Sequence, residues 1–310
     1  MTTIVVAADF GGPEVLSVRE IDLPEPGPGQ VRIAVRAAGV NPVDVKSYGG
    51  SRGTDPSRLP LPLGMEAAGV ITAVGPGVER SIGEEVVVFR TSGAYASDLV
   101  TAADTALPKP AGLDWAAAGG LLLTGATAVH ALTATNVSDG ETVLVHGGAG
   151  GVGLMAIQLA ALRGAQVVAT ASPAKHALLR EFGAIPVAYG AGLLDRVREA
   201  APQGIDAALD LIGTDEAMET SLALVSDPGR VATIANYGPL PKDGVKRLGG
   251  GPGADPGTEL RNAARAELID LAGTGRLRVL IDRTYPLAEA ADAHRQIIDG
   301  HVTGKLVLIP

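Results

Sequence analysis

A glycine-rich turn is the part of the sequence whose residue types and spacing point most directly to chemistry. The turn, 147–153, follows a β-branched segment at 142–146 and precedes an apolar segment at 154–162, so a strand, a turn and a helix are predicted. Within the turn, the spacing G-x-G-x-x-G is met by Gly148, Gly150 and Gly153. In this order the glycines permit a tight turn, the approach of the backbone to a pyrophosphate, and close packing of the helix on the strand. The pattern predicts a dinucleotide-binding site.

The start of the following helix supplies further anion-binding groups. Gly151 and Val152 would present backbone N–H groups to the pyrophosphate, aided by the partial positive charge of the helix N-terminus. In a chain with 42 glycines the spacing alone is weak, and an ordinary glycine-rich loop is the alternative. The strand before the turn and the helix after it favour nucleotide binding.

The next predicted strand, 166–171, indicates which dinucleotide is bound. An NAD-binding unit usually places Asp or Glu about 20 residues after the glycines, where the carboxylate holds the ribose hydroxyls. Here Ser172 and Lys175 follow the strand and no acid does. A hydroxyl and an ammonium suit a 2′-phosphate, so the pattern favours NADPH. The alternative is that Ser172 caps a helix at 175–182 and Lys175 lies on its solvated face.

Composition and charge exclude several classes of function. The 310 residues suggest two domains, and the net charge of −9 is scattered, without the basic stripe expected of a nucleic-acid or membrane-surface protein. The absence of cysteine excludes disulfides, thiolate zinc sites and a cysteine nucleophile. With no recognisable signal peptide and no run of about 18 apolar residues, a soluble, cytoplasmic protein without a membrane partner is expected.

The texture of the sequence changes along the chain. Short β-rich segments separated by Gly/Pro turns occupy 1–107 and predict a β-barrel or sandwich, whereas 113–135 predicts a helix. From residue 142, strands and helices alternate, which predicts a doubly wound parallel sheet. The stretch 249–257 is the only one that resembles a linker, and it precedes a helix expected at 258–272 and a final strand that returns to the first domain.

Five segments together carry a family resemblance: 39–44, 63–75, 123–128, the glycine turn and 303–308. In this order, and over nearly the whole chain, the sequence resembles the zinc-independent medium-chain dehydrogenases/reductases of the quinone oxidoreductase type. The resemblance implies an α/β protein with a GroES-like β-barrel catalytic domain at 1–115 and 252–310 and a doubly wound, parallel-sheet Rossmann NADP-binding domain at 116–251. It also implies an NADPH-dependent two-electron reduction and a homodimer.

One segment argues against a metal. Zinc-dependent relatives carry a cysteine and a Gly-His-Glu ligand segment, where this chain has Gly64-Met65-Glu66 and no cysteine. Zinc prefers three or four nitrogen or sulfur donors, so no metal site is expected. A hydride acceptor that needs no Lewis acid, such as a quinone or an enone, is the expected small-molecule substrate.

The resemblance assigns roles to residues of the catalytic domain. Asn41 matches an asparagine beside the nicotinamide, whose amide would donate to a substrate carbonyl oxygen; a turn asparagine before a proline is the alternative. Asp44 is expected to orient its neighbours rather than to transfer protons, with a surface-turn aspartate as the alternative. Lys305 resembles a family lysine near the cofactor, the alternative being an edge-strand lysine that prevents aggregation. His301, where relatives often carry arginine, is a weaker candidate.

Three further residues are assigned to the cofactor by the same resemblance. Thr127 matches a threonine that contacts the nicotinamide, although a helical threonine can instead bond back to its own turn. Tyr189 matches a tyrosine beside the adenosine phosphate; the alternative is a tyrosine at a strand end whose hydroxyl is exposed to solvent. Asn236, followed by Tyr237 and Gly238, is expected at the carboxyl edge of the parallel sheet, where open α/β folds bind ligands.

The leading hypothesis is NADPH-dependent reduction of a quinone or conjugated carbonyl by hydride transfer. The alternatives are an enoyl-thioester or alkene double-bond reductase on the same scaffold and a non-catalytic NADP-binding redox sensor. Lys46 stands where close relatives often have tyrosine, with Tyr48 two positions later, so the pocket differs from theirs. Three phenylalanines and one tryptophan supply few aromatic side chains to stack on a large planar quinone, so a small enone or α,β-unsaturated aldehyde is an alternative substrate. No pattern identifies the physiological substrate or the proton donor.

Overall fold

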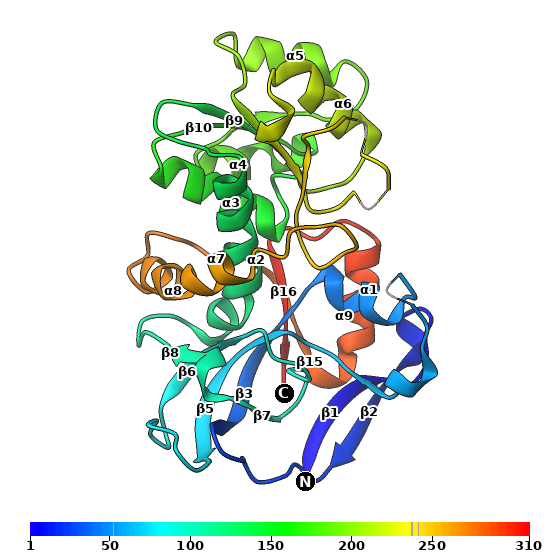
Figure 1. The fold of residues 1–310 in the computed structure, drawn as a ribbon, viewed down its shortest axis with the longest axis vertical. Helices are drawn as coiled ribbons and strands as arrows, with labels where there is room; N and C mark the ends of the chain where they lie inside the picture. The colour runs from blue at the N-terminus through cyan, green and yellow to red at the C-terminus, as the bar shows by residue number, and fades with distance from the viewer. Residues whose placement is uncertain (52, 237, 241) are drawn as a thin grey trace. The chain divides into compact units, whose positions relative to one another are not determined.

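The computed structural model describes residues 1–310 except 52, 237 and 241, and the chain forms two compact units (Figure 1). Unit 1 consists of Met1–Leu123 and Ala266–Pro310, and unit 2 of Thr124–Arg265. The family resemblance implies boundaries at 115/116 and 251/252. The first of these lies at the start of helix α2 (Trp115–Ala134), whereas the division between the compact units falls inside that helix.

Unit 1 is built on two sheets. The three-stranded sheet has the order β2 (Leu16–Ile21), β1 (Thr2–Ala7), β4 (Leu61–Pro62). The seven-stranded sheet has the order β15 (Ile281–Pro286), β16 (Lys305–Ile309), β3 (Gln30–Val40), β5 (Glu66–Val74), β6 (Glu85–Phe89), β8 (Ala106–Pro108), with β7 (Asp98–Ala102) paired to β3. The segment before β7 joins the sheets, because Tyr95 accepts the Val5 N–H at 2.8 Å while Ser97 accepts the Val35 N–H at 2.9 Å.

The long strand β3 changes character along its length. Its first half alternates between buried and partly exposed residues, as a half-buried strand does, and its last four residues are all buried. Around that end β3 pairs with both β5 and β16, so the final strand does return to the first domain. Gly39 is required here, because a Cβ would lie 2.4 Å from Glu66 Oε1 and 2.6 Å from the carbonyl oxygen of Gly119.

The helices of unit 1 are α1 (Pro42–Tyr48), α9 (Ala290–Ile298), the first part of α2 and most of α8 (Arg265–Gly273). Short 3-10 turns lie at Pro13–Val15, Pro56–Arg58, Ala103–Thr105 and Leu287–Glu289. Asn41, for which a turn asparagine before a proline was the alternative interpretation, is the N-cap of α1. Pro42 takes the first helical position, where its missing N–H costs nothing. Helices α1 and α9 pack on each other.

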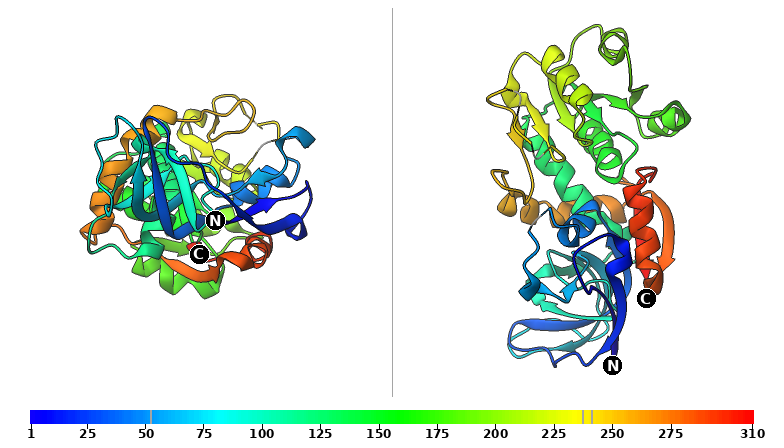
Figure 2. Two further views of the ribbon diagram at one scale, coloured as in Figure 1. Left: turned by 90° about the horizontal axis from the view of Figure 1, so that it is seen from below. Right: turned by 90° about the vertical axis from the view of Figure 1, so that its right-hand side faces the viewer.

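Unit 2 is a doubly wound parallel sheet, as predicted. Its strand order is β11 (Ile185–Val187), β10 (Gln166–Thr170), β9 (Thr142–His146), β12 (Ala207–Asp210), β13 (Val231–Thr233), β14 (Lys246–Arg247). This is the order of a classical dinucleotide-binding sheet, with β9 at the point where the winding reverses. The helices between the strands are α3 (Gly151–Leu162), α4 (His176–Glu181), α5 (Leu193–Ala200) and α6 (Asp215–Leu224), and α7 (Thr258–Ala263) follows β14 (Figure 2). Short 3-10 turns lie at Pro173–Lys175 and Pro228–Arg230.

The prediction that 249–257 is a linker was wrong, because this stretch is folded within unit 2. Leu248 forms a parallel bridge with Asp255, and the Asp255 carboxylate lies 3.2 Å from His130 Nε2 on α2, so the glycine-rich stretch folds back onto unit 2. The helix expected at 258–272 is interrupted at Ala264, which separates α7 from α8. Glycine content alone therefore did not distinguish a linker from a folded loop.

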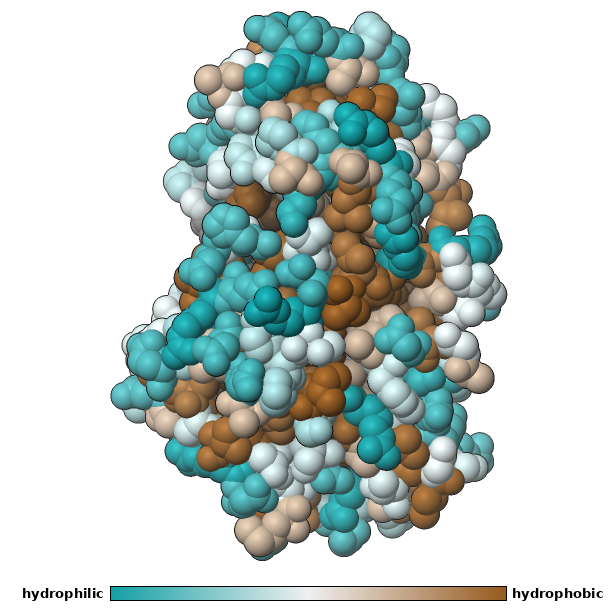
Figure 3. All heavy atoms as spheres, turned by 180° about the vertical axis from the view of Figure 1, so that it is seen from behind, coloured by the Kyte–Doolittle hydropathy of each residue, from teal (hydrophilic) through white to brown (hydrophobic). Residues whose placement is uncertain are grey.

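Within the described residues, one helix is long and apolar enough to cross a membrane by length and composition, namely α2. Its most apolar window is 78% buried, and the core helix of a soluble protein passes the same test. The sequence analysis did not single it out, because glycines, threonines and His130 interrupt its apolar residues. On the face shown in Figure 3, several hydrophobic residues lie next to one another among hydrophilic ones.

Candidate functional site

The glycine turn of unit 2 has the geometry of an anion cradle. A Cβ on Gly153 would lie 2.4 Å from the carbonyl oxygen of Gly147, so only glycine lets α3 start this close to the turn. A Cβ on Gly148 would lie 2.8 Å from that of Ala169 on β10. At Gly150, by contrast, the described residues place only the Gly147 carbonyl oxygen within 4 Å, at 3.5 Å, so there is space for a Cβ. That space is where a phosphate can approach the backbone.

The glycines of the turn differ in one respect from the roles predicted from their spacing. The residue with left-handed backbone is Gly147, with a φ of 76°, and not Gly148. Gly148 is instead needed for close approach to β10. Gly150 is the N-cap of α3 and carries no capping side chain, while Gly151 and Val152 form its first turn and are partly exposed. N–H groups in a first turn have no intrahelical acceptor and are therefore suited to an anion.

The residues predicted to select the cofactor follow the adjacent strands. Ser172 and Lys175 come directly after β10, and the 61%-exposed Tyr189 comes after β11, so all three lie beyond the carboxyl ends of parallel neighbours. Ser172 makes no side-chain capping bond, so the helix-cap interpretation does not account for it. The first acidic residue after β10 is Glu181, at the far end of α4.

A buried aspartate that the sequence analysis missed organises the same edge of the sheet. Asp210, at the end of β12, accepts hydrogen bonds from the N–H groups of Ile212 and Gly213 at 3.1 and 2.7 Å and from Thr233 Oγ1 at 2.8 Å. Thr233 in turn accepts the N–H of Asn236 at 3.0 Å. The carboxylate thereby fixes the loops after β12 and β13. A strand-ending Asp before Leu-Ile-Gly is the sequence signal that could have identified it.

Two further predicted site residues, Thr127 and Asn236, also lie in unit 2. Thr127 is buried on α2. Asn236 also receives Arg247 Nε–H on its carbonyl oxygen at 3.1 Å, and its side-chain oxygen accepts the N–H of Gly238 at 2.9 Å. Tyr237 lies outside the described residues.

Unit 1 contains a buried cluster around the ammonium group of Lys305. Its Nζ donates to Asn41 Oδ1 at 2.5 Å, to Glu66 Oε1 at 3.0 Å and to the Val40 carbonyl oxygen at 3.0 Å. These bonds use all three ammonium hydrogens. Strand β16 lies between β15 and β3, so the edge-strand interpretation of this lysine was wrong.

Asn41 and Asp44 are held in the same cluster. The Asn41 amide donates to Glu66 Oε1 at 2.9 Å and to the Gly39 carbonyl oxygen at 3.3 Å, and Lys305 on its oxygen fixes this orientation. Asp44 accepts the Asn41 backbone N–H at 2.9 Å, which closes a capping box at the start of α1. Because Asp44 is 3% exposed, it is not a surface-turn aspartate.

A second group of buried polar residues continues from Asp44. Tyr95 Oη donates to Asp44 Oδ2 at 2.9 Å and lies 3.2 Å from His294 Nε2, and Tyr48 Oη lies 2.8 Å from His294 Nδ1. Burial raises the pKa of Asp44 to about 6, although the bond from Tyr95 opposes this effect. Burial also lowers the pKa of His294 to about 4. The sequence analysis named neither Tyr95 nor His294.

The donor set does not fit a zinc ion. Within the described part of the chain, no group of three or more His, Asp or Glu side chains is close enough to hold a metal. Both oxygens of the Glu66 carboxylate are engaged, Oε1 by Lys305 and Asn41 and Oε2 by the backbone N–H of Leu123 at 2.8 Å. An ammonium ion therefore neutralises the carboxylate that corresponds to the ligand segment of zinc-dependent relatives.

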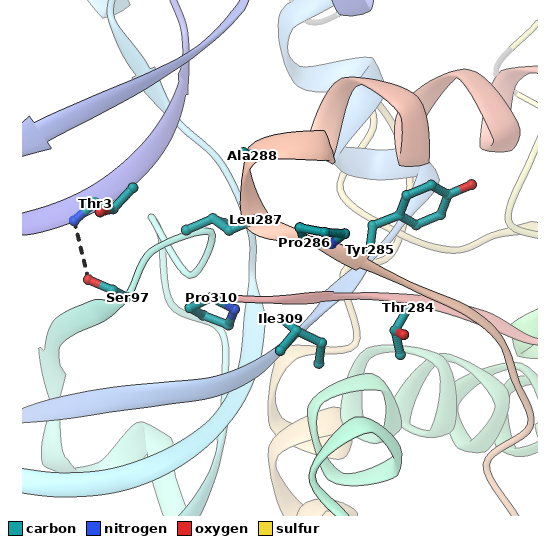
Figure 4. A pocket seen from close by; sticks show the side chains of 9 residues that line it. All are labelled: Thr3, Ser97, Thr284, Tyr285, Pro286, Leu287, Ala288, Ile309 and Pro310. Carbon is teal, nitrogen blue, oxygen red and sulfur yellow. Dashed lines mark hydrogen bonds between the residues drawn. The ribbon is translucent and has the colours of Figure 1, made fainter.

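A shallow pocket of about 630 Å³ lies elsewhere in unit 1 (Figure 4). Its lining residues are Thr3, Ser97, Thr284, Tyr285, Pro286, Leu287, Ala288, Ile309 and Pro310. None of them is a predicted site residue, and none is charged. The pocket therefore supports no assignment of chemistry.

The fold and the glycine cradle define a dinucleotide-dependent oxidoreductase of the medium-chain type. Residues 27–136 match the model of the alcohol dehydrogenase GroES-like domain, and residues 182–308 match that of the zinc-binding dehydrogenases, whose metal this donor set does not fit. Quinone oxidoreductase of Pseudomonas aeruginosa is 36% identical over 98% of both chains. The chain belongs to the quinone oxidoreductase family of medium-chain dehydrogenases/reductases.

Solved structures agree with this membership. Escherichia coli quinone oxidoreductase complexed with NADPH has a TM-score of 0.87 and 29% identity, covering 99% of this chain and 100% of that one. The CurK enoyl reductase has a TM-score of 0.85 and 27% identity, covering 99% of each chain.

Proposed function

We propose that this protein reduces a quinone or a conjugated carbonyl compound with NADPH, by hydride transfer and without zinc. The observation that carries the proposal is the glycine cradle at the start of α3, beside a strand end that bears Ser172 and Lys175 in place of an acid. The relatives support it, because E. coli quinone oxidoreductase was crystallised with NADPH.

The proposed NADPH site is formed by unit 2. The cradle from Gly148 to Gly153 suits the pyrophosphate, with Gly151 and Val152 as backbone donors. Lys175 and Ser172 would hold the 2′-phosphate, while Tyr189, Asn236 and Thr127 would contact other parts of the cofactor. Bound NADPH supplies the hydride, so the protein contributes binding, orientation and exclusion of water.

Replacing Lys175 with alanine is expected to weaken NADPH binding by about 1–3 kcal/mol and to leave NADH binding almost unchanged, because only NADPH carries the phosphate that the ammonium pairs with. Titration calorimetry with both cofactors measures the difference. Arg180→Ala, which removes an exposed positive charge from α4, is the matched control and should change neither affinity. Equal losses for both cofactors in Lys175→Ala would refute the assignment.

The residues of unit 1 are proposed to act on the substrate. Asn41 would donate an amide hydrogen to the carbonyl oxygen, where negative charge develops during hydride transfer. The weaker of its two amide bonds, the 3.3 Å contact with Gly39, is the one that such a donation would replace. Asp44 holds the Asn41 backbone, and Lys305 fixes the orientation of its amide. Lys305 remains a proposed cofactor contact.

Zinc independence has a direct test. We expect turnover to survive exhaustive dialysis against a strong chelator, and elemental analysis to find no stoichiometric zinc, because the Glu66 carboxylate is already neutralised by Lys305. Activity that is lost on dialysis and restored by zinc would contradict the account.

The substrate class has one serious competitor. Similarity to the CurK enoyl reductase favours an enoyl-thioester or alkene double-bond reductase as the second candidate. Both reactions consume NADPH, so the same assay follows both. A panel of quinones, small enones and enoyl thioesters then distinguishes them by the acceptor that is reduced. A protein that binds NADPH but reduces none of them would be the redox sensor instead. We further propose a cytoplasmic homodimer without nucleic-acid or membrane partners.

A further inference from the structure

We propose that His294 is a positioning residue for this reaction: it anchors a one-way chain of hydrogen bonds that holds Asp44, and through Asp44 the substrate-orienting Asn41. The inference rests on the proposed function for its kinetic consequences. Its structural part stands on the contacts of unit 1 alone, among Tyr48 on α1, Tyr95 before β7 and His294 on α9.

The direction of the chain follows from the chemistry of its last member. An ionised carboxylate only accepts hydrogen bonds, so the single hydroxyl proton of Tyr95 must be donated to Asp44. The Tyr95 oxygen can then only accept from its other partner, which requires a proton on His294 Nε2. A neutral imidazole protonated at Nε2 has an acceptor at Nδ1, so Tyr48 donates to it. Every member therefore donates toward Asp44.

The surroundings fix the imidazole ring in place. The ring of Tyr48 stacks on that of His294 with an interplanar angle of 7° and a centroid distance of 5.6 Å, and the ring of Tyr95 meets it edge-on. All three side chains have no exposed surface. A fully satisfied buried network is rigid, whereas the loss of one member leaves its neighbours unsatisfied in a low dielectric.

The last member of the hydrogen-bond chain, Asp44, contacts the proposed substrate-orienting residue Asn41. The Asp44 oxygen that receives Tyr95 also receives the backbone N–H of Asn41. Removing the Tyr95 donor frees that carboxylate to rotate, and the start of α1 can then shift. Displacements of about 1 Å cost up to about 100-fold in rate when an orienting group is moved, even without loss of binding.

The hydrogen-bond chain also predicts how kcat depends on pH. Burial is the main cause of the raised pKa of Asp44. Among the described residues, the titratable groups that face it are Tyr95 and Lys305, which lower its pKa, Glu66, which raises it, and the buried Tyr48. Protonation of Asp44 removes the charge that fixes the direction of the chain, so kcat should fall as the pH drops through about 6. Without the Tyr95 hydroxyl, which stabilises the ionised carboxylate, this acid limb should move to higher pH.

Nitrogen-15 NMR of labelled protein tests the chain without any activity measurement. At neutral pH we expect the His294 signal, assigned by its loss in His294→Gln, to show a neutral ring protonated at Nε2. A ring protonated at Nδ1, or a charged ring, would overturn the proposed direction.

Kinetics of matched variants tests the positioning role. Tyr95→Phe and His294→Phe should lower kcat by about 10- to 100-fold with little change in KM for NADPH, and Tyr95→Phe should raise the pH of the acid limb. His294→Gln, which offers both an acceptor and a donor, should recover most of kcat. Tyr285→Phe loses a different tyrosine bond to α9, the partly buried 2.5 Å contact with Gln296, and should leave kcat unchanged.

The outcomes separate the two levels of the account. Wild-type kcat and an unmoved acid limb in folded Tyr95→Phe would overturn the positioning role while leaving the proposed function intact. If His294→Phe does not fold, Tyr95→Phe and His294→Gln still decide the matter. If the wild-type protein reduces no acceptor, the proposed function and the kinetic role of His294 are both refuted. The NMR measurement still tests the direction of the hydrogen-bond chain.

Discussion

Replacing Lys305 with methionine is expected to lower the free energy of unfolding by about 3–5 kcal/mol, because it leaves the Glu66 carboxylate buried without its counterion. Both side chains are almost fully buried, with exposures of 3% and 1%. Methionine fills most of the same volume, so the loss reports the missing charge rather than a cavity. Urea denaturation of the two proteins at neutral pH measures the difference.

Two further variants make this first prediction specific. The double variant Glu66→Gln with Lys305→Met removes both charges and should recover part of the stability, because no buried ion remains uncompensated. Arg198→Met breaks a pair with Asp195 in which both side chains are more than half exposed, and should cost less than about 1 kcal/mol. A loss of that small size in Lys305→Met would mean that Glu66 is not held as an ion.

The second large effect is expected at the glycine cradle. Gly153→Ala places a Cβ 2.4 Å from a backbone carbonyl oxygen that cannot move aside like a flexible side chain. The turn or the helix must shift, so we expect NADPH affinity to fall by at least about 100-fold, together with a loss of stability. Fluorescence titration and thermal unfolding measure the two effects.

Gly150→Ala is the matched comparison at the other end of the turn. Its Cβ would meet nothing closer than 3.5 Å, so the fold should be unaffected. NADPH binding should nevertheless weaken, because the methyl group occupies the space into which the phosphates approach. Unchanged affinity in Gly150→Ala would place the pyrophosphate elsewhere.

Local patterns explain why the cofactor unit was largely predictable. The strand β9, the turn and the helix α3 are contiguous, and Gly148 and Gly153 are constrained by neighbours on the adjacent strand or within a few residues. The exception is Gly147: spacing alone does not show which of two consecutive glycines is left-handed. The fold of the stretch after Leu248 was missed for a related reason, since its bond to His130 joins residues 125 positions apart.

The buried cluster of unit 1 was only half predictable. Asn41 and Asp44 lie in one short motif, so the resemblance identified them together. The resemblance also identified Lys305, but not its contact with Glu66, which is 239 residues away. Tyr95 and His294, which are 199 residues apart, were not identified. A single sequence carries no periodicity that links such positions, and the chemistry of His294 becomes apparent only once α9 packs on α1.

The central claim is that this chain transfers hydride from NADPH to a quinone or a conjugated carbonyl compound without a metal. Its most direct test is the oxidation of NADPH by the purified, chelator-treated protein, followed by the loss of reduced-nicotinamide absorbance with a quinone, a small enone or an enoyl thioester as acceptor. We predict turnover with the quinone or the enone, and slower turnover when NADH replaces NADPH. Absence of NADPH oxidation with every acceptor, or oxidation with the enoyl thioester alone, would contradict the account.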